Sequence, residues 1–433
     1  MIRFVLTFAL LLASTIARAE IEVQEVTSPG GIDAWLVEEH SIPFVALELR
    51  FRGGASLDAP GKRGAVNLMT ALLEEGAADM DARAFTRQTE EIAARFNYDA
   101  SDDTVSVSAQ FLTEKRDAAV ALLRDSLISP RFDEDAVERV RAQVISNIRS
   151  NAKDPDTIAG MTFDRLAFGD HPYGSSRNGT EDSVSALTRE DLQEAHGAAL
   201  ARDRIYVSAV GDITSEELGE LLDALLGDLP EHGAPMPDKA DYQLEGGVTV
   251  VDFDTPQSVA VFGHQGIARD DPDFFAAYVL NHILGGRGFE SRLMQEVREK
   301  RGLTYGVYSY LVPKDLEALY QGSVASANDR IAQAISVIRE EWARMAEEGV
   351  TEQELEAAKT YLTGAYPLRF DGNGRIADIL VGMQMDNLST DYIVTRNDKV
   401  RAVTVEDVKR VAERILRPKD LHFVVVGKPE GLE

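Results

Sequence analysis

The chain has 433 residues, of which 44% are hydrophobic and 27% charged, a composition typical of a globular protein with more than one domain. Its formal net charge is −28, which argues against nucleic acid and anionic membrane surfaces as partners. It contains no cysteine, and this excludes disulfides, thiolate metal sites and lipid attachment at a cysteine.

Residues 1–19, MIRFVLTFALLLASTIARA, have the pattern of a secretory signal peptide. The basic residue Arg3 precedes an apolar run at residues 4–13, and the segment ends in a small-x-small pattern at residues 17–19. The apolar run is too short to span a bilayer comfortably. We expect cleavage before Glu20, and an exported chain without disulfides suits a bacterial periplasm.

The first half of the remaining chain predicts both strands and helices. Strands are indicated by alternating apolar residues, and helices by apolar residues at helical spacing. The expected strands are residues 35–37, 44–51, 104–111 and 205–210. The expected helices are residues 61–76, 84–96, 115–127, 134–150 and 188–200, with a loop at residues 171–180.

The second half repeats this order. Its expected strands are residues 248–252, 258–263, 305–310, 319–326 and 422–426. Its expected helices are residues 274–284, 290–300, 331–348, 352–362 and 405–415. The sequence VSAVGD at residues 207–212 matches FVVVGK 216 residues later, and FDEDAVERV from Phe132 matches VTEQELEAA 218 residues later.

This offset predicts a domain duplication, because a single repeat of more than 200 residues is too long for a solenoid. The two α+β halves are expected at residues 20–229 and 248–433. The linker between them is expected at residues 230–247, PEHGAPMPDKADYQLEGG, which are rich in proline, glycine and charge.

Four stretches carry a family resemblance: FRGGASLDAPGKRGAVNLMTALLEEGA, HPYGSSRNGT, YVSAVGDI and GGRGFESRLMQEVREKRGLTYGVYS. With the duplicated layout, they resemble the pitrilysin/insulinase-like zinc metallopeptidase family, which includes mitochondrial processing peptidase and the cytochrome bc1 core proteins. The resemblance covers essentially the whole mature chain. It implies two repeated domains, each an antiparallel-rich mixed sheet with helices packed on one face, and paired halves that close around a chamber.

The family's catalytic signature is HxxEH on a helix of the first half. The two histidines share one helix face and bind zinc, and the glutamate activates the metal-bound water. The resemblance places this signature on Asn67, Thr70 and Ala71, and a further glutamate ligand on Asn147. None of these replacements is a good zinc ligand or base. We therefore predict that this chain holds no metal or other cofactor and has no peptidase activity alone.

The seven histidines offer no substitute, because no two lie close enough in sequence to form a helical i, i+4 pair. We interpret them as structural residues, with His264 and His282 as candidates for positions near the chamber. Glu74 and Glu75 follow the lost signature, but adjacent carboxylates do not face one another on a helix, so they indicate a solvated helix end.

A glycine-rich stretch in the second half begins with Gly285, Gly286 and Gly288. Taken alone, it predicts only a glycine-led helix, a solvated arginine and a core tyrosine. In active family members, an arginine and a tyrosine of this half reach the substrate carbonyl and oxyanion, and the resemblance places them on Arg298 and Tyr305. The glycines, which have no Cβ, would let a substrate backbone or a partner approach closely.

Some bacterial relatives are split into two chains, one with HxxEH and one with only the Arg…Tyr pair, and this chain resembles the second kind. We expect a non-catalytic, oxyanion-donating subunit of a periplasmic heteromeric zinc metallopeptidase, with zinc on an HxxEH-bearing paralogous partner and peptides as substrates. Family substrates add as a strand beside the first sheet, here near residues 104–111. The alternatives are a non-enzymatic core or peptide-binding protein of the same fold, and a stand-alone enzyme with a relocated metal site.

Overall fold

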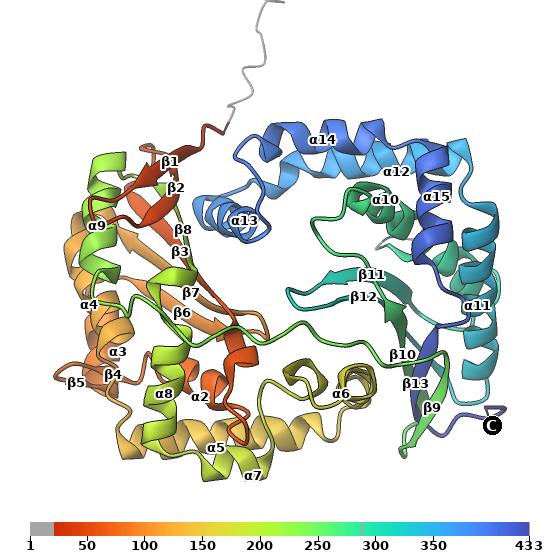
Figure 1. The fold of residues 1–433 in the computed structure, drawn as a ribbon, viewed down its shortest axis with the longest axis horizontal. Coiled ribbons are helices and arrows are strands. Elements are labelled where there is room, and N and C mark those ends of the chain that lie inside the picture. Colours follow the sequence, from red (N-terminus) through yellow and green to blue (C-terminus); the bar gives the residue numbers. More distant parts are fainter. Residues whose placement is uncertain (1–20, 287, 289, 433) are drawn as a thin grey trace, which may run out of the picture.

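The structure, a computed structural model, describes residues 21–286, 288 and 290–432. The expected signal peptide, residues 1–19, lies outside the described residues. Figure 1 shows two halves side by side, each with a sheet and an outer layer of helices, and the linker runs from one half to the other. Within the described ranges, no helix is long and apolar enough to cross a membrane.

The first half is built on a six-stranded sheet in the order β1-β2-β8-β3-β7-β6. β2 and β8 pair in parallel, and the other neighbours pair antiparallel. The strands are β1 (Gln24–Thr27), β2 (Asp33–Glu38), β3 (Phe44–Arg52), β6 (Arg95–Ala100), β7 (Thr104–Leu112) and β8 (Ile205–Gly211), and β4 (Gly76–Ala77) and β5 (Met80–Asp81) form a separate small pair. The helices are α2 (Ala65–Ala71), α3 (Ala82–Glu91), α4 (Arg116–Ile128), α5 (Glu134–Asn151), α6 (Pro155–Phe168), α7 (Glu181–Ala186), α8 (Arg189–Ala199) and α9 (Ser215–Leu226).

The second half is built on a five-stranded sheet in the order β11-β12-β10-β13-β9, in which only β13 and β9 pair in parallel. The strands are β9 (Gly247–Asp252), β10 (Gln257–Gln265), β11 (Val307–Pro313), β12 (Ala318–Ala327) and β13 (His422–Gly427). The helices are α10 (Phe274–Gly285), α11 (Ile331–Glu348), α12 (Glu352–Ala365), α13 (Asn373–Met385), α14 (Tyr392–Ala402) and α15 (Val405–Ile415). These two antiparallel-rich mixed sheets with helices confirm the predicted α+β fold class.

One helix of each half packs against the sheet of the other half. α13 of the second half packs against β3 and β8, where Ala377 and Leu380 join Val37, Ala46 and Val210 in one buried apolar cluster. α6 of the first half packs against β10 and β13 in the same way. Its cluster contains Ala159, Phe163, Ala167, Phe168, Val261, Leu319, Val424 and Val426. The inner face of each sheet is therefore covered by a helix that is distant in sequence, and neither helix was predicted.

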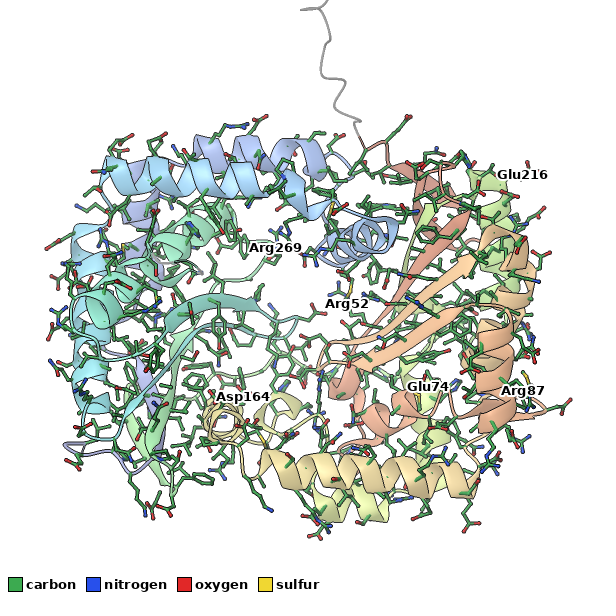
Figure 2. All side chains as sticks on the ribbon, turned by 180° about the vertical axis from the view of Figure 1, so that it is seen from behind. Arg52, Glu74, Arg87, Asp164, Glu216 and Arg269 are labelled. Atoms are coloured by element: carbon green, nitrogen blue, oxygen red, sulfur yellow. The ribbon has the colours of Figure 1, made fainter. Side chains whose placement is uncertain are left out.

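The connection between β11 and β12 also crosses to the first half. The Lys314 ammonium lies 2.7 Å from an Asp102 carboxylate oxygen, and the Arg52 guanidinium lies 2.6 Å from Asp315. Figure 2 shows Arg52 near the middle of the molecule, where the halves meet. Because these side chains are at most about a quarter exposed, water screens their ion pairs less than it would on an open surface. Charge pairs thus join the halves in addition to the exchanged helices.

Several predicted elements differ from the observed ones near glycines and turns. The helix predicted at residues 84–96 is wrong at its end, because α3 stops at Glu91 and the chain then forms β6. Ala93 has φ +52°, a left-handed conformation that a continuing helix does not allow. The helix predicted at residues 61–76 is shorter in the structure, and α2 begins only after Gly64.

The predicted helix at residues 290–300 is a π-helical turn over Met294–Glu299. Such turns are rare and occur often at functional positions. The following strand begins at Val307 and not at Tyr305, so Tyr305 stands in the connection before β11. By contrast, α11 and α15 have the predicted bounds.

Candidate functional site

The helix that would carry the zinc signature is α2, in the core of the first half. Asp58 fixes its start, because the Asp58 carboxylate accepts hydrogen bonds of 2.8 Å from two backbone N–H groups at residues 64 and 66. Thr70 is 2% exposed, and its hydroxyl has no hydrogen-bond partner among the residues that the structure describes. Asn67 is half-buried, and the Ala71 side chain has no atom that could bind a metal.

The fourth position of the lost zinc site is Asn147 on α5. Its side chain is exposed, and its amide oxygen accepts a hydrogen bond of 3.1 Å from Gln143 Nε2. No group of three or more histidine, aspartate or glutamate side chains that could hold a metal ion exists in the described part of the chain. Glu75 is instead ion-paired with Arg139. The residues at these positions do not fit the zinc ion that the resemblance implies.

His264 is not near a chamber, and this interpretation is corrected by the structure. His264 is fully buried, and its Nε2 accepts a hydrogen bond of 3.0 Å from the Trp342 indole N–H. Its other ring nitrogen, Nδ1, lies 2.7 Å from the backbone oxygen of Gln265, to which it donates. Burial lowers the pKa of His264 to about 4, so the ring is neutral and structural at neutral pH. His282 is half-buried and stacks on Tyr361 with ring centroids 5.0 Å apart.

The three glycines of the second half lie in different surroundings. Gly285 and Gly286 are buried, and a Cβ on Gly285 would lie 2.3 Å from the Ser309 hydroxyl oxygen. At this position glycine lets the end of α10 pack closely against β11. Gly288 is exposed with φ +138°, and a Cβ there would meet no atom within 4 Å. Of the three predicted substrate-binding glycines, Gly288 is therefore the accessible one.

Arg298 and Tyr305 both lie at the surface beyond α10. Arg298 is in the π-helical turn, its side chain is 32% exposed, and its Nε lies 3.5 Å from a Glu299 carboxylate oxygen. Gly302, with φ +61°, ends this turn. Tyr305 follows it and is 87% exposed. The guanidinium and the phenol can both donate hydrogen bonds to a carbonyl or an oxyanion.

Ion pairs hold the backbone on both sides of Arg298. Arg292 forms a bidentate pair with Glu354, with nitrogen–oxygen distances of 2.6 and 2.8 Å. After the turn, Lys300 Nζ lies 2.6 Å from Glu296. The hydrogen bond from Lys300 keeps the pKa of the Glu296 carboxyl below its ordinary value, so this pair stays charged at neutral pH. The turn that carries Arg298 is thus anchored to α12 and to its own helix.

The expected substrate-binding strand at residues 104–111 is not available for pairing, because β7 is hydrogen-bonded to β3 on one side and to β6 on the other. The edge strand on this side of the first sheet is β6, over Arg95–Ala100, and β1 is the edge strand on the other side. The period-two pattern of β6 could have revealed it, but no glycine or proline separates it from the preceding helix, so it was read as the end of that helix.

Arg298 and Tyr305 are hydrogen-bond donors, whereas the positions of the family's zinc ligands and base hold Asn67, Thr70, Ala71 and Asn147. Such donors can stabilise the negative charge of a tetrahedral intermediate. They cannot generate the attacking nucleophile. The arrangement is suited to stabilising the oxyanion of a hydrolytic reaction. Activating the attacking water requires a zinc ion and a base, for which this chain has no suitable residues at the family's positions.

Comparison with protein families matches both halves. The model of insulinase (peptidase family M16) matches residues 34–181, and that of the peptidase M16 inactive domain matches residues 186–362. Among curated proteins, the non-peptidase homolog YmxG of Helicobacter pylori is 26% identical over 394 residues, which is 90% of each chain. An uncharacterized zinc protease of Mycobacterium leprae is 29% identical over 405 residues, which is 92% of this chain and 90% of that protein.

Solved structures show the same relationship. A peptidase M16 inactive domain from Pseudomonas fluorescens is 28% identical with a TM-score of 0.89, and the match covers 95% of this chain and 100% of that one. A protease from Helicobacter pylori, at 19% identity and a TM-score of 0.85 over 94% of this chain and 100% of its own, shares the fold. The chain therefore belongs to the insulinase (M16) peptidase family, as a peptidase-like member without the zinc signature.

Proposed function

We propose that this chain is the non-catalytic, oxyanion-donating subunit of a periplasmic heteromeric zinc metallopeptidase that degrades or processes peptides. The zinc and the HxxEH signature belong to a paralogous partner subunit. This chain contributes Arg298 and Tyr305, which donate hydrogen bonds to the substrate carbonyl and to the oxyanion that forms from it. Gly288, where a Cβ would meet no atom within 4 Å, leaves room for the backbone of a substrate.

The observation that carries the proposal is the contrast between the two halves. In the first half, the zinc positions hold Asn67, Thr70 and Ala71, which do not fit a metal. In the second half, Tyr305 is 87% exposed, so its hydroxyl is open to a bound substrate. A tyrosine in this exposed position contributes little to stability. Donating a hydrogen bond to a bound substrate would give it a function.

The test uses a complex with an HxxEH-bearing relative encoded beside this chain. Both chains are co-expressed, purified together and assayed with an internally quenched peptide. Arg298→Ala and Tyr305→Phe are each expected to lower kcat by about 10²–10³, the usual loss for one oxyanion donor. The complex itself should still form, because neither side chain fills a core position.

Matched control variants separate the donor role from a general effect. Arg87→Ala removes an exposed arginine on α3, which Figure 2 shows at the outer rim of the first half. Tyr361→Phe removes the hydroxyl of another exposed tyrosine of the second half, which is 58% exposed. Both controls should keep full activity. If Arg298→Ala and Tyr305→Phe also keep it, the donor role is wrong. A stable complex with a non-peptidase partner would favour the scaffold function instead.

The periplasmic location is tested separately. Expression of residues 1–433 in a Gram-negative host should deliver the chain to the periplasm. Amino-terminal sequencing of that material should begin at Glu20. A chain that stays in the cytoplasm with residues 1–19 attached would contradict this part of the proposal.

A further inference from the structure

The segment that presents Tyr305 is a short connection between the π-helical turn and β11. It runs from Gly302 to Gly306 and contains no regular helix or strand. Because Tyr305 is 87% exposed, packing against the protein does little to hold its ring. The value of its phenol as a preorganised donor therefore depends on how firmly this connection is fixed.

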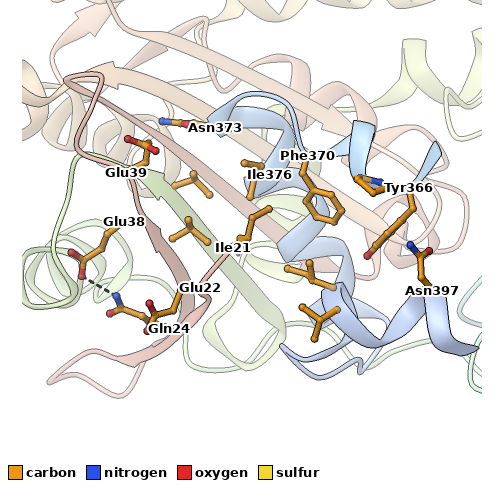
Figure 3. Close-up of a pocket in the computed structure, with 15 residues that line it drawn as sticks. Ile21, Glu22, Gln24, Glu38, Glu39, Tyr366, Phe370, Asn373, Ile376 and Asn397 are labelled. Atoms are coloured by element: carbon orange, nitrogen blue, oxygen red, sulfur yellow. Dashed lines mark hydrogen bonds between the residues drawn. The ribbon is translucent and has the colours of Figure 1, made fainter. Parts of the chain in front are cut away.

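Tyr366 shows how packing fixes a tyrosine elsewhere in the chain. It lines a pocket of about 990 Å³ between the halves, which Figure 3 shows, and it is 7% exposed. Its ring packs edge to face on Phe370 with centroids 5.1 Å apart. The Arg396 guanidinium lies 4.7 Å from its centroid. The ring of Tyr305 is not enclosed in this way, so its order depends on the hydrogen bonds of the backbone around it.

The first part of the connection is tied to the π-helical turn. The Gly302 N–H donates to the Arg298 carbonyl at 2.8 Å. The Leu303 N–H donates to the Val297 carbonyl at 3.0 Å. The Leu303 carbonyl in turn accepts a hydrogen bond from the Ser326 hydroxyl of β12. The backbone that follows Arg298 is therefore held on both sides as far as Leu303.

Thr304 extends this anchoring to Tyr305. The Gly306 N–H donates to Thr304 Oγ1 at 3.1 Å, which closes a turn around Tyr305. The Thr304 hydroxyl also lies 2.6 Å from the Ala325 carbonyl oxygen and 2.8 Å from the Gly306 carbonyl oxygen. A hydroxyl has one proton, so these two carbonyls share it, and the Ala325 oxygen is the nearer. One side chain thus closes the turn and attaches it to β12.

The sheet register shows what this attachment replaces. The pairing of β11 with β12 begins at Val307, which lies opposite Val324. One more pair in the same register would set Gly306 opposite Ala325, but the ladder stops before it. The Thr304 hydroxyl donates to the Ala325 carbonyl at this point, so a side chain takes over where the backbone pairing ends.

We propose that Thr304 is the positioning residue of the Tyr305 donor, an inference that rests on the proposed function. By joining Gly306 to β12, the Thr304 hydroxyl fixes the backbone from which the phenol projects before any substrate binds. A donor that is already in place needs no ordering when charge develops on the substrate oxygen. Thr304 touches no reacting atom and acts through Tyr305.

A direct contact of Thr304 with substrate fits the structure less well. The Thr304 side chain is half-buried, and its hydroxyl is already engaged by Gly306 and Ala325. A substrate group could bind this hydroxyl only by breaking the contacts that hold the turn.

The test changes Thr304 in the complex with the HxxEH-bearing relative. Thr304→Val keeps the shape of the side chain and removes the hydroxyl, whereas Thr304→Ser keeps the hydroxyl. We expect Thr304→Val to lower kcat about 10- to 100-fold with little change in KM, because a displaced donor is felt mainly in the transition state. Thr304→Ser should retain most of the activity.

Thr363→Val is the matched control. The Thr363 hydroxyl is on a half-buried residue and donates to the Lys359 carbonyl at 2.8 Å, but it lies on α12, outside the segment that carries Arg298 and Tyr305. This variant should keep full activity.

A double-mutant cycle tests whether Thr304 acts through Tyr305. A Tyr305→Phe chain has no hydroxyl left to position at residue 305, so adding Thr304→Val should lower kcat by less than about twofold. A purely structural role of Thr304 predicts the same loss in both backgrounds.

Hydrogen exchange on the isolated full chain reports on the turn without a partner subunit. The Gly306 amide should exchange at least about tenfold faster in Thr304→Val, because its hydrogen-bond acceptor is gone, and at the original rate in Thr304→Ser. An unchanged exchange rate in Thr304→Val would overturn the proposal.

The kinetic outcomes separate this inference from the proposed function. If Tyr305→Phe lowers kcat and Thr304→Val does not, the donor function stands and the positioning role is wrong. The positioning role is also wrong if Thr304→Ser is as inactive as Thr304→Val, or if Thr304→Val lowers kcat equally with and without the Tyr305 hydroxyl. If Tyr305→Phe leaves kcat unchanged, the donor function itself is wrong and the positioning role ends with it.

Discussion

Replacing Asp164 by asparagine is expected to stabilise the protein above about pH 6 and to have little effect near pH 4. Asp164 lies on α6, the helix of the first half that packs against the second sheet. Figure 2 shows Asp164 toward the middle of the molecule. Burial raises the pKa of its carboxyl from 3.8 to about 6. Lys314 offsets this only in part, because its ammonium lies 2.7 Å from Asp102, which itself repels Asp164.

The magnitude follows from the two pKa values. The folded protein holds a proton on Asp164 that the unfolded chain releases between about pH 4 and pH 6. The free energy of unfolding therefore falls as pH rises through this window. The difference between 3.8 and about 6 corresponds to at most about 3 kcal/mol, at about 1.4 kcal/mol per pH unit. Asparagine keeps the shape of the side chain and carries no charge, so this loss should disappear.

The assay is urea unfolding of both proteins from pH 4 to pH 8. The stability of the unchanged chain relative to Asp164→Asn should decline between pH 4 and pH 6 and then level off. Asp170→Asn, which changes an exposed carboxylate just after the same helix, is the control and should show no such difference. A gap between Asp164→Asn and the unchanged chain that is the same at pH 4 and pH 8 would refute the reasoning.

Two further predictions concern the exchanged helices and the lost zinc site. Leu380→Ala removes a fully buried side chain from the contact of α13 with the first sheet, so it should lower the free energy of unfolding by about 2–5 kcal/mol in urea titrations. It should also speed proteolysis within the linker at residues 230–247, and an unchanged cleavage rate would show that α13 does not hold the halves together. Metal analysis of the purified chain should find no stoichiometric zinc, because Asn67, Thr70, Ala71 and Asn147 do not fit the ion, and one bound zinc per chain would contradict this.

Local sequence patterns predicted the strongly amphipathic helices. α11 and α15 are amphipathic helices, and the Thr404–Asp407 capping box explains why the start of α15 could be read from sequence. β6 was missed because its residues follow a helix without a glycine or proline between them. The helix ends at Glu91, and no residue pattern indicates the left-handed backbone conformation of Ala93, two residues later.

The exchanged helices could not be predicted for a different reason. α6 and α13 cover sheets made by strands of the other half, and this pairing is a property of the assembled chain. The positions of the lost zinc site and of Arg298 and Tyr305 came from the family resemblance, whereas the 87% exposure of Tyr305 came only from the structure. The pocket between the halves had no signal in the sequence, because its lining joins Ile21 to Asn397.

The exchange of α6 and α13 has a consequence for how this chain matures. The first sheet buries Val37, Ala46 and Val210 only when α13 docks, and α13 is complete only at Met385. A nascent chain of 433 residues therefore cannot finish its first half until most of the second has been made. If residues 1–19 act as the predicted signal peptide and the chain is exported unfolded, this late step would delay compaction and keep the chain unfolded enough for export until synthesis is nearly complete.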